Sequence, residues 1–238
     1  MSKIASELSA VFITDGLSHE DALARYKKRR DELKKQFRGP IVLRGVQKPV
    51  EYSRAWMQLD QLLIQDPLFL YLTGLNQYNC ALLLQANEDD ILFLGNKNLD
   101  DEFWDGKVIS YDETTLQELS LLLGVKVIKS IDELFETVCK RCDEQEIATL
   151  YTMWHVSEDS KKNNAFEFYY SFKLELEDQL KQAKLKQCNL LSIEPFIYRR
   201  LELDQTDIDN MEQAISITNK AFFNICKNIQ SYMTETDI

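Results

Sequence analysis

Two aspartates stand where a carboxylate could act as a general acid or base, Asp66 and Asp105. Asp66 precedes a proline and Asp105 precedes a glycine. Both pairs are typical of turns, in which the carboxylate bonds to nearby backbone N–H groups. We therefore interpret both aspartates as turn residues and not as catalytic groups. Gly74 and Gly106 are interpreted in the same way, as turn positions where a side chain would clash.

Residue types that bind metals are present, but their spacing does not predict a metal site. His19 and His155 do not form the H-E-x-x-H pattern of a zinc site on a helix. Cys139 and Cys142 form one C-x-x-C on a predicted helix, whereas a zinc site needs a second pair or suitably spaced histidines. The five cysteines are scattered and odd in number, which does not suggest a disulfide framework. We interpret these residues as structural.

The net charge of −11 argues against a general phosphate-binding surface, so we expect no nucleic-acid partner. One basic segment, residues 25–38, departs from this balance. Acidic residues interrupt it, and we interpret it as a solvated helix face. The longest apolar runs are too short to cross a bilayer, and the first residues do not form a secretory signal. We therefore expect no membrane contact and a cytoplasmic location.

Capping signals and apolar runs predict the elements that position these residues. Ser18 with Asp21 starts a helix, and Gly39-Pro40 ends it. Further helices are expected over 114–123, 130–141 and 163–186, and strands over 41–43, 68–72, 80–85, 91–94, 125–128, 147–151 and 190–193. The polar turn at 87–90 suits a hairpin between two of these strands. The strands are apolar on both faces, which predicts an α/β fold with a mixed β-sheet flanked by helices.

The last segment has a different character. Thr206 with Asp209 starts a helix that carries one apolar stripe, because its apolar residues are spaced alternately three and four apart. The stripe comprises Ile208, Met211, Ile215, Thr218, Phe222, Ile225 and Ile229. We expect it to pack against a second copy of the chain or against its own domain. Residues 234–238 have the pattern of another helix start, so we expect the chain to be truncated there.

The order of these motifs resembles the amino-terminal domain of Xaa-Pro aminopeptidase (aminopeptidase P), in the creatinase and prolidase superfamily. The matching motifs are Leu70-Tyr71-Leu72-Thr73-Gly74-Leu75, Leu92-Phe93-Leu94, Trp104-Asp105-Gly106, Leu123-Gly124-Val125 and the segments 198–203 and 207–214. The resemblance implies a ribonuclease-H-like domain over residues 1–197. Residues 198–238 would be the junction and first helix of a truncated pita-bread catalytic domain. Residues 64–69 and 47–59 depart from the family pattern, so no substrate contact is carried over from them.

The resemblance also implies which half of the enzyme does the chemistry. The parent protein would remove the amino-terminal residue from peptides whose second residue is proline. Two divalent metal ions (manganese, cobalt or zinc) would be held in its carboxy-terminal domain. This chain would contain no catalytic residue, no metal ligand and no cofactor, and alone it should be inactive. It would support a homodimer and border the substrate entrance through Phe103 and Trp104. A core position for Trp104, closing the sheet edge, is the other interpretation.

Two alternatives stay open at the level of sequence. The chain could be a protein-binding module derived from an aminopeptidase fold that has lost its metal site. The large subunit of a eukaryotic histone chaperone complex resembles aminopeptidases in this way, and an acidic surface is compatible with basic partners. Whether the parent is an enzyme thus depends on metal ligands beyond residue 238. The chain could also be an unrelated α/β domain, which the absence of a hairpin over 80–94 would favour.

Overall fold

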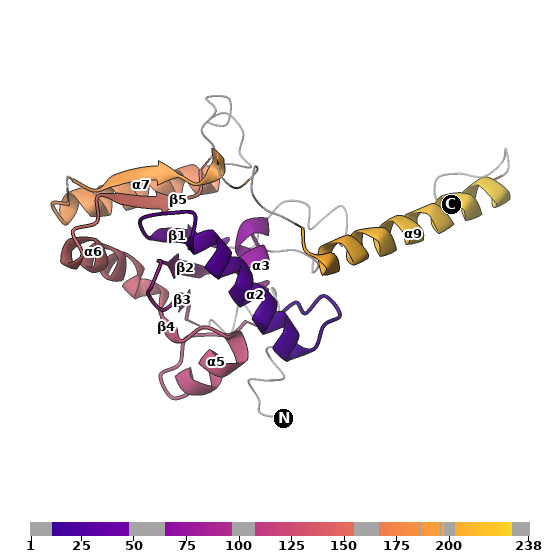
Figure 1. The fold of residues 1–238 in the computed structure, drawn as a ribbon, viewed down its shortest axis with the longest axis horizontal. Coiled ribbons are helices and arrows are strands. Elements are labelled where there is room, and N and C mark those ends of the chain that lie inside the picture. Colours follow the sequence, from indigo (N-terminus) through magenta and orange to yellow (C-terminus); the bar gives the residue numbers. More distant parts are fainter. Residues whose placement is uncertain are drawn as a thin grey trace. The chain divides into compact units, whose positions relative to one another are not determined.

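The structure is a computed structural model that describes residues 11–47, 65–96, 108–154, 167–185, 187–195, 197 and 203–229. The chain divides into two compact units, Met1–Ile197 and Tyr198–Ile238. Figure 1 shows both, and each is described here by itself. Among the helices in these ranges, none is both long enough and apolar enough to cross a membrane.

The first unit is built on a six-stranded sheet with the order β4-β3-β2-β1-β5-β6. The strands are β1 Ile41–Arg44, β2 Cys80–Leu84, β3 Ile91–Leu94, β4 Val127–Ser130, β5 Thr149–Thr152 and β6 Asn189–Ser192. Only β2 runs antiparallel to its neighbours, β1 and β3, and the other neighbouring strands are parallel. The predicted mixed sheet and the predicted hairpin over 80–94 are both confirmed.

Helices cover both faces of this sheet. Alternate residues of a strand face opposite sides, so strands that are apolar throughout place apolar side chains on both faces. The helices are α2 His19–Lys34, α3 Pro67–Thr73, α5 Leu116–Leu123, α6 Leu134–Glu144 and α7 Glu167–Gln182, with a 3-10 turn, η1 Ile131–Glu133, before α6. Residues of α2, α3 and α5 pack with Leu43, Leu82 and Leu92. Residues of α6 and α7 pack with Val42 and Leu83 on the opposite face. The central strands β1, β2 and β3 are therefore buried on both faces (Figure 1).

Residues 67–73 form helix α3, so the strand predicted there is wrong. Asp66 is the N-cap, and its Oδ1 accepts a hydrogen bond from the Phe69 N–H at 2.8 Å. Pro67 fits the first turn, where its missing N–H has no helical partner to lose. Gly74 ends the helix with φ of 69°, and a Cβ there would overlap the Tyr26 ring. These caps at both ends outweigh the strand-like aromatic and aliphatic composition between them.

The basic segment on α2 is not a fully solvated face, because Arg30 is only 1% exposed. Its guanidinium donates to Asp90 Oδ2 at 2.8 Å, to the Leu72 carbonyl at 3.0 Å and to the Gly124 carbonyl at 2.9 Å. Lys34 Nζ donates to the other Asp90 oxygen at 2.7 Å. Burial opposes the charged form of Lys34, but its bonds to aspartates outweigh this and raise its pKa. This buried ion network joins α2 to α3, to the end of α5 and to the β2–β3 turn.

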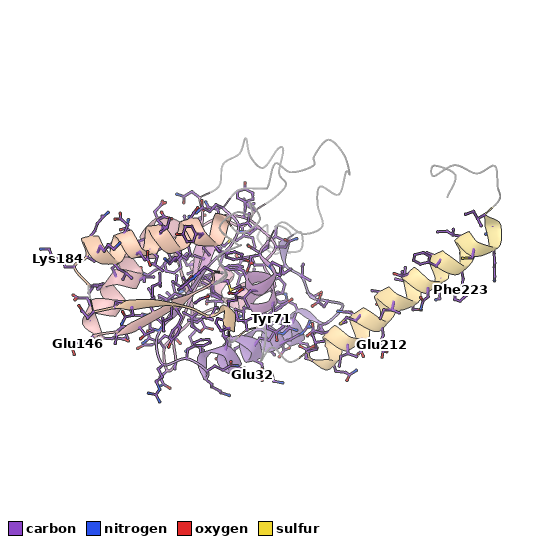
Figure 2. All side chains as sticks on the ribbon, turned by 90° about the horizontal axis from the view of Figure 1, so that it is seen from above. Glu32, Tyr71, Glu146, Lys184, Glu212 and Phe223 are labelled. Carbon is purple, nitrogen blue, oxygen red and sulfur yellow. The ribbon has the colours of Figure 1, made fainter. Side chains whose placement is uncertain are left out.

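The second unit contains helix α9, Gln205–Asn228. Asp204 and Asp207 form a reciprocal capping box, so the helix begins before Thr206, where the sequence predicted its start. No residue of α9 is buried, and Figure 2 shows side chains such as Phe223 along it. On the predicted stripe, Ile215 is 57% exposed and Phe222 63% exposed. The partner surface expected for this stripe stays a prediction.

Candidate functional site

The residues that flank segments 48–64 and 97–107 converge on two buried glutamines at one end of the sheet. Gln65 is 5% exposed and Gln77 is 2% exposed. Segment 97–107 carries Phe103, Trp104, Asp105 and Gly106, which lie outside the described residues. The described residues therefore show how this segment is anchored at both ends, and we treat the anchor as the candidate functional site.

Gln77 holds the chain directly after segment 97–107. Its Nε2 donates to the Ile109 carbonyl at 2.8 Å, and its Oε1 accepts from the Ile109 N–H at 2.8 Å. The backbone N–H and carbonyl of buried Ile109 are thus both bonded to the side-chain amide of Gln77. Since unbonded buried backbone groups are costly, this pairing fixes Ile109 in one place.

Gln65 bonds through its side-chain amide to the backbone on either side of segment 48–64. Its Oε1 accepts from the Val46 N–H at 2.9 Å and from the Asp66 N–H at 2.8 Å. Its Nε2 donates to the main-chain carbonyl of Gln77. A Cβ on Gly45 would lie only 2.6 Å from this Nε2, so a larger residue there would displace the Gln65 amide from its partners. The two glutamines are therefore one connected unit.

Backbone hydrogen bonds join the same positions to the start of β2. The Asn79 N–H donates to Val46 O at 2.6 Å, and the Gly95 N–H donates to Asn79 O at 2.9 Å. Beyond the segment, the Tyr111 N–H donates to Gly95 O at 3.1 Å. Gly95 before segment 97–107 and Tyr111 after it are thus bonded to each other, and Ile109 after it is also bonded to Gln77. This arrangement sets the spacing and direction of the two ends of the segment.

The described groups around this anchor do not form a catalytic set. Burial raises the pKa of the Cys80 thiol to about 12, so it stays protonated and is a poor nucleophile. Burial lowers the pKa of Arg44 at the end of β1, where its guanidinium lies 5.7 Å from the centre of the Phe172 ring. Its Nη1 is 3.9 Å from a carboxylate oxygen of the more exposed Glu175. These contacts stabilise the sheet end and do not place a base beside a nucleophile.

Of the predicted site residues, only Gly74 lies in the described part, where it ends α3 shortly before Gln77. The roles assigned to Phe103, Trp104, Asp105 and Gly106 stay predictions. Sequence reasoning did not identify Gln65 or Gln77 as important. A glutamine carries no turn, capping or catalytic signal by itself, so no local pattern would have distinguished these two from surface glutamines.

Within the described ranges, no group of three or more histidine, cysteine, aspartate or glutamate side chains is placed to hold a metal ion. The described residues therefore do not fit the two-metal centre that the family resemblance implies for the parent. No catalytic step can be assigned to them through such a centre.

Comparisons with known proteins agree with the fold. The family described as aminopeptidase P, N-terminal domain, matches residues 26–151, while none of the curated protein sequences matches. A Bacillus anthracis protein described as an aminopeptidase P has a TM-score of 0.69 and 19% identity, covering 90% of this chain and 48% of its own. Proline aminopeptidase P II from Yersinia pestis has a TM-score of 0.66 and 16% sequence identity. The match covers 90% of this chain and 47% of the Yersinia pestis chain.

Aminopeptidase P from Escherichia coli, solved with the inhibitor Pro-Leu, has a TM-score of 0.64 and 16% identity, covering 92% of this chain and 47% of its own. At these identities the likeness is one of fold. The chain spans about half the length of these solved structures. The family match covers more than half of the chain and lies within the unit whose fold these structures share. The chain therefore belongs to the aminopeptidase P N-terminal domain family.

Proposed function

We propose that this chain is the non-catalytic amino-terminal domain of a longer, metal-dependent Xaa-Pro aminopeptidase. Such an enzyme removes the amino-terminal residue from peptides whose second residue is proline. Family membership supports this proposal, as does coverage of about half of each solved relative. The parent's two divalent metal ions, with manganese, cobalt and zinc as candidates, would be bound outside the described residues. A cytoplasmic homodimer remains part of the proposal.

In this proposal the domain assists subunit pairing and forms one edge of the substrate entrance. The observation that carries it is the glutamine anchor, because Gln77 and the Gly95 backbone hold the two ends of the segment with Phe103 and Trp104. Anchored ends limit the conformations that a binding segment must lose when it meets a ligand. Tryptophan suits such a surface, since it supplies a large contact area while its N–H can stay solvated or paired.

Replacing Trp104 with alanine in the product of the complete gene is expected to lower kcat/KM for an Xaa-Pro peptide about tenfold. This is the effect of removing one important aromatic contact, roughly 1.4 kcal/mol. The melting temperature should not change, because an entrance residue contributes little to the core. Peptide hydrolysis with added manganese and thermal unfolding measure the two effects.

Trp154→Ala is the matched control. Trp154 is half-buried beyond β5, with the Lys173 Nζ 5.7 Å from its ring centre, and is not bonded to the glutamine anchor. Its loss should leave kcat/KM unchanged. A Trp104→Ala protein that melts several degrees lower, with unchanged kcat/KM, would instead place Trp104 in the core and contradict the entrance role.

A further inference from the structure

Two matching helix ends lie at one end of the first unit, away from the glutamine anchor. Glu146 after α6 and Lys184 after α7 have positive φ angles of 49° and 61°, and Figure 2 shows both at this end. After α6 the Ile147 N–H donates to the Cys142 carbonyl at 2.9 Å, and after α7 the Leu185 N–H donates to the Leu180 carbonyl at 2.9 Å. These are Schellman-type helix ends, which fix the direction in which the chain leaves each helix.

From these turns the chain enters two neighbouring strands, which brings two cysteines together. β5 and β6 are parallel, with Thr149 paired to Asn189, and the Asn189 N–H donates to Ala148 O at 2.9 Å. Cys188 therefore lies beside the turn that is bonded to Cys142. Cys188 packs against the hydrophobic cluster that contains Cys142, and the interaction of the two thiols raises the pKa of Cys142 and lowers the pKa of Cys188.

Only one of these two sulfurs faces an opening. Cys142 is buried, whereas Cys188 is half-buried and lines an open pocket of about 740 Å³. Interaction with the Cys142 thiol outweighs burial and lowers the pKa of Cys188. By contrast, burial raises the pKa of Cys139. Since the thiolate is the reactive form, Cys188 is the cysteine of this cluster that reacts first with an oxidant.

We propose that Cys188 and Cys142 form a redox-sensitive pair, in which hydrogen peroxide converts two neighbouring thiols into a disulfide between α6 and the start of β6. The Cys188 thiolate attacks one peroxide oxygen, the O–O bond breaks and hydroxide leaves, which yields a sulfenic acid. Cys142 sulfur then attacks Cys188 sulfur, the S–S bond forms and the S–O bond breaks. The departing hydroxide takes the Cys142 proton and leaves as water. The two thiols lose two electrons, and the peroxide is reduced to water.

Peptide mapping of the folded full chain after peroxide treatment tests this pair. We expect a peptide that links Cys142 to Cys188, lighter by two hydrogens than the two free peptides and separated again by dithiothreitol. Cys188→Ser should abolish it. Cys226→Ser, which removes an exposed cysteine of α9, and Cys139→Ser, which removes a neighbouring thiol, should both retain it.

A second readout is independent of the mapping. The oxidised chain should unfold at a higher urea concentration than the reduced chain, because a disulfide restricts the unfolded state. Circular dichroism of Cys188→Ser verifies that this variant is folded. The proposal is overturned if Cys188 is recovered as sulfinic acid, if it is linked to Cys139, or if it stays reduced while Cys226 is oxidised.

Discussion

Replacement of Asp90 by alanine is expected to lower the free energy of unfolding by about 3–5 kcal/mol, the cost of leaving a buried charge without its partner. Asp90 is the only carboxylate bonded to Arg30 among the described residues, and Arg30 is almost fully buried. Arginine does not lose its proton in a protein, so its charge would remain. Lys34, itself poorly exposed, would also lose one of its acceptors.

Urea denaturation of Asp90→Ala and of its neighbour Asp89→Ala provides a matched comparison. Asp89 lies in the same turn, but both side chains of its ion pair with Lys126 are exposed. Exposed pairs of this kind contribute little, so Asp89→Ala should unfold at the same urea concentration as the unchanged chain. Equal losses in the two variants would contradict the assignment of Asp90 to a buried ion network.

Replacement of Gln77 by leucine is expected to lower the free energy of unfolding by about 2–6 kcal/mol. Leucine has a similar size but cannot bond to the N–H and the carbonyl of Ile109, so two buried backbone groups would be left without partners. Each such group costs about 1–3 kcal/mol. In the product of the complete gene, kcat/KM should also fall at temperatures where the variant is folded, because one end of segment 97–107 is released.

Gln182→Leu is the control for this substitution. Gln182 is the last residue of α7, is exposed and bonds only to Asp178 among the described residues. The same change of side chain there should have little effect on urea denaturation. If Gln77→Leu is as mild as Gln182→Leu, the glutamine anchor does not hold the chain as the structure indicates.

Much of the sheet could be predicted because its central strands are buried on both faces. Residues 80–84 and 91–94 are continuous apolar runs separated by a polar turn, which leaves few alternatives to a hairpin. The Ser18 cap was equally direct, since its Oγ accepts from the Asp21 N–H as the sequence indicated. In both cases the deciding interaction joins residues close in sequence.

The two errors in the predicted fold have different causes. Residues 67–73 are too short and too apolar for periodicity to separate a helix from a strand, and only the Asp-Pro start and the glycine end decide it. Arg30 was interpreted as part of a solvated helix face because acidic residues interrupt the basic run around it. Its partner Asp90 lies 60 residues away in the sequence, so no neighbouring residue indicated the burial.

The candidate site was predicted only in part. The motif around Trp104 identified a segment, but the amide that holds the chain after this segment comes from Gln77, before β2. Its bonding depends on how separate loops meet at the end of the sheet. A sequence pattern cannot show this without the fold.

Hydrolysis of an Xaa-Pro peptide with added manganese, measured in parallel on this chain and on the product of the complete gene, tests the central claim most directly. The account predicts hydrolysis by the complete product and none by residues 1–238 alone. Activity in this chain by itself would contradict its non-catalytic role. Absence of activity from both proteins would contradict an enzymatic parent.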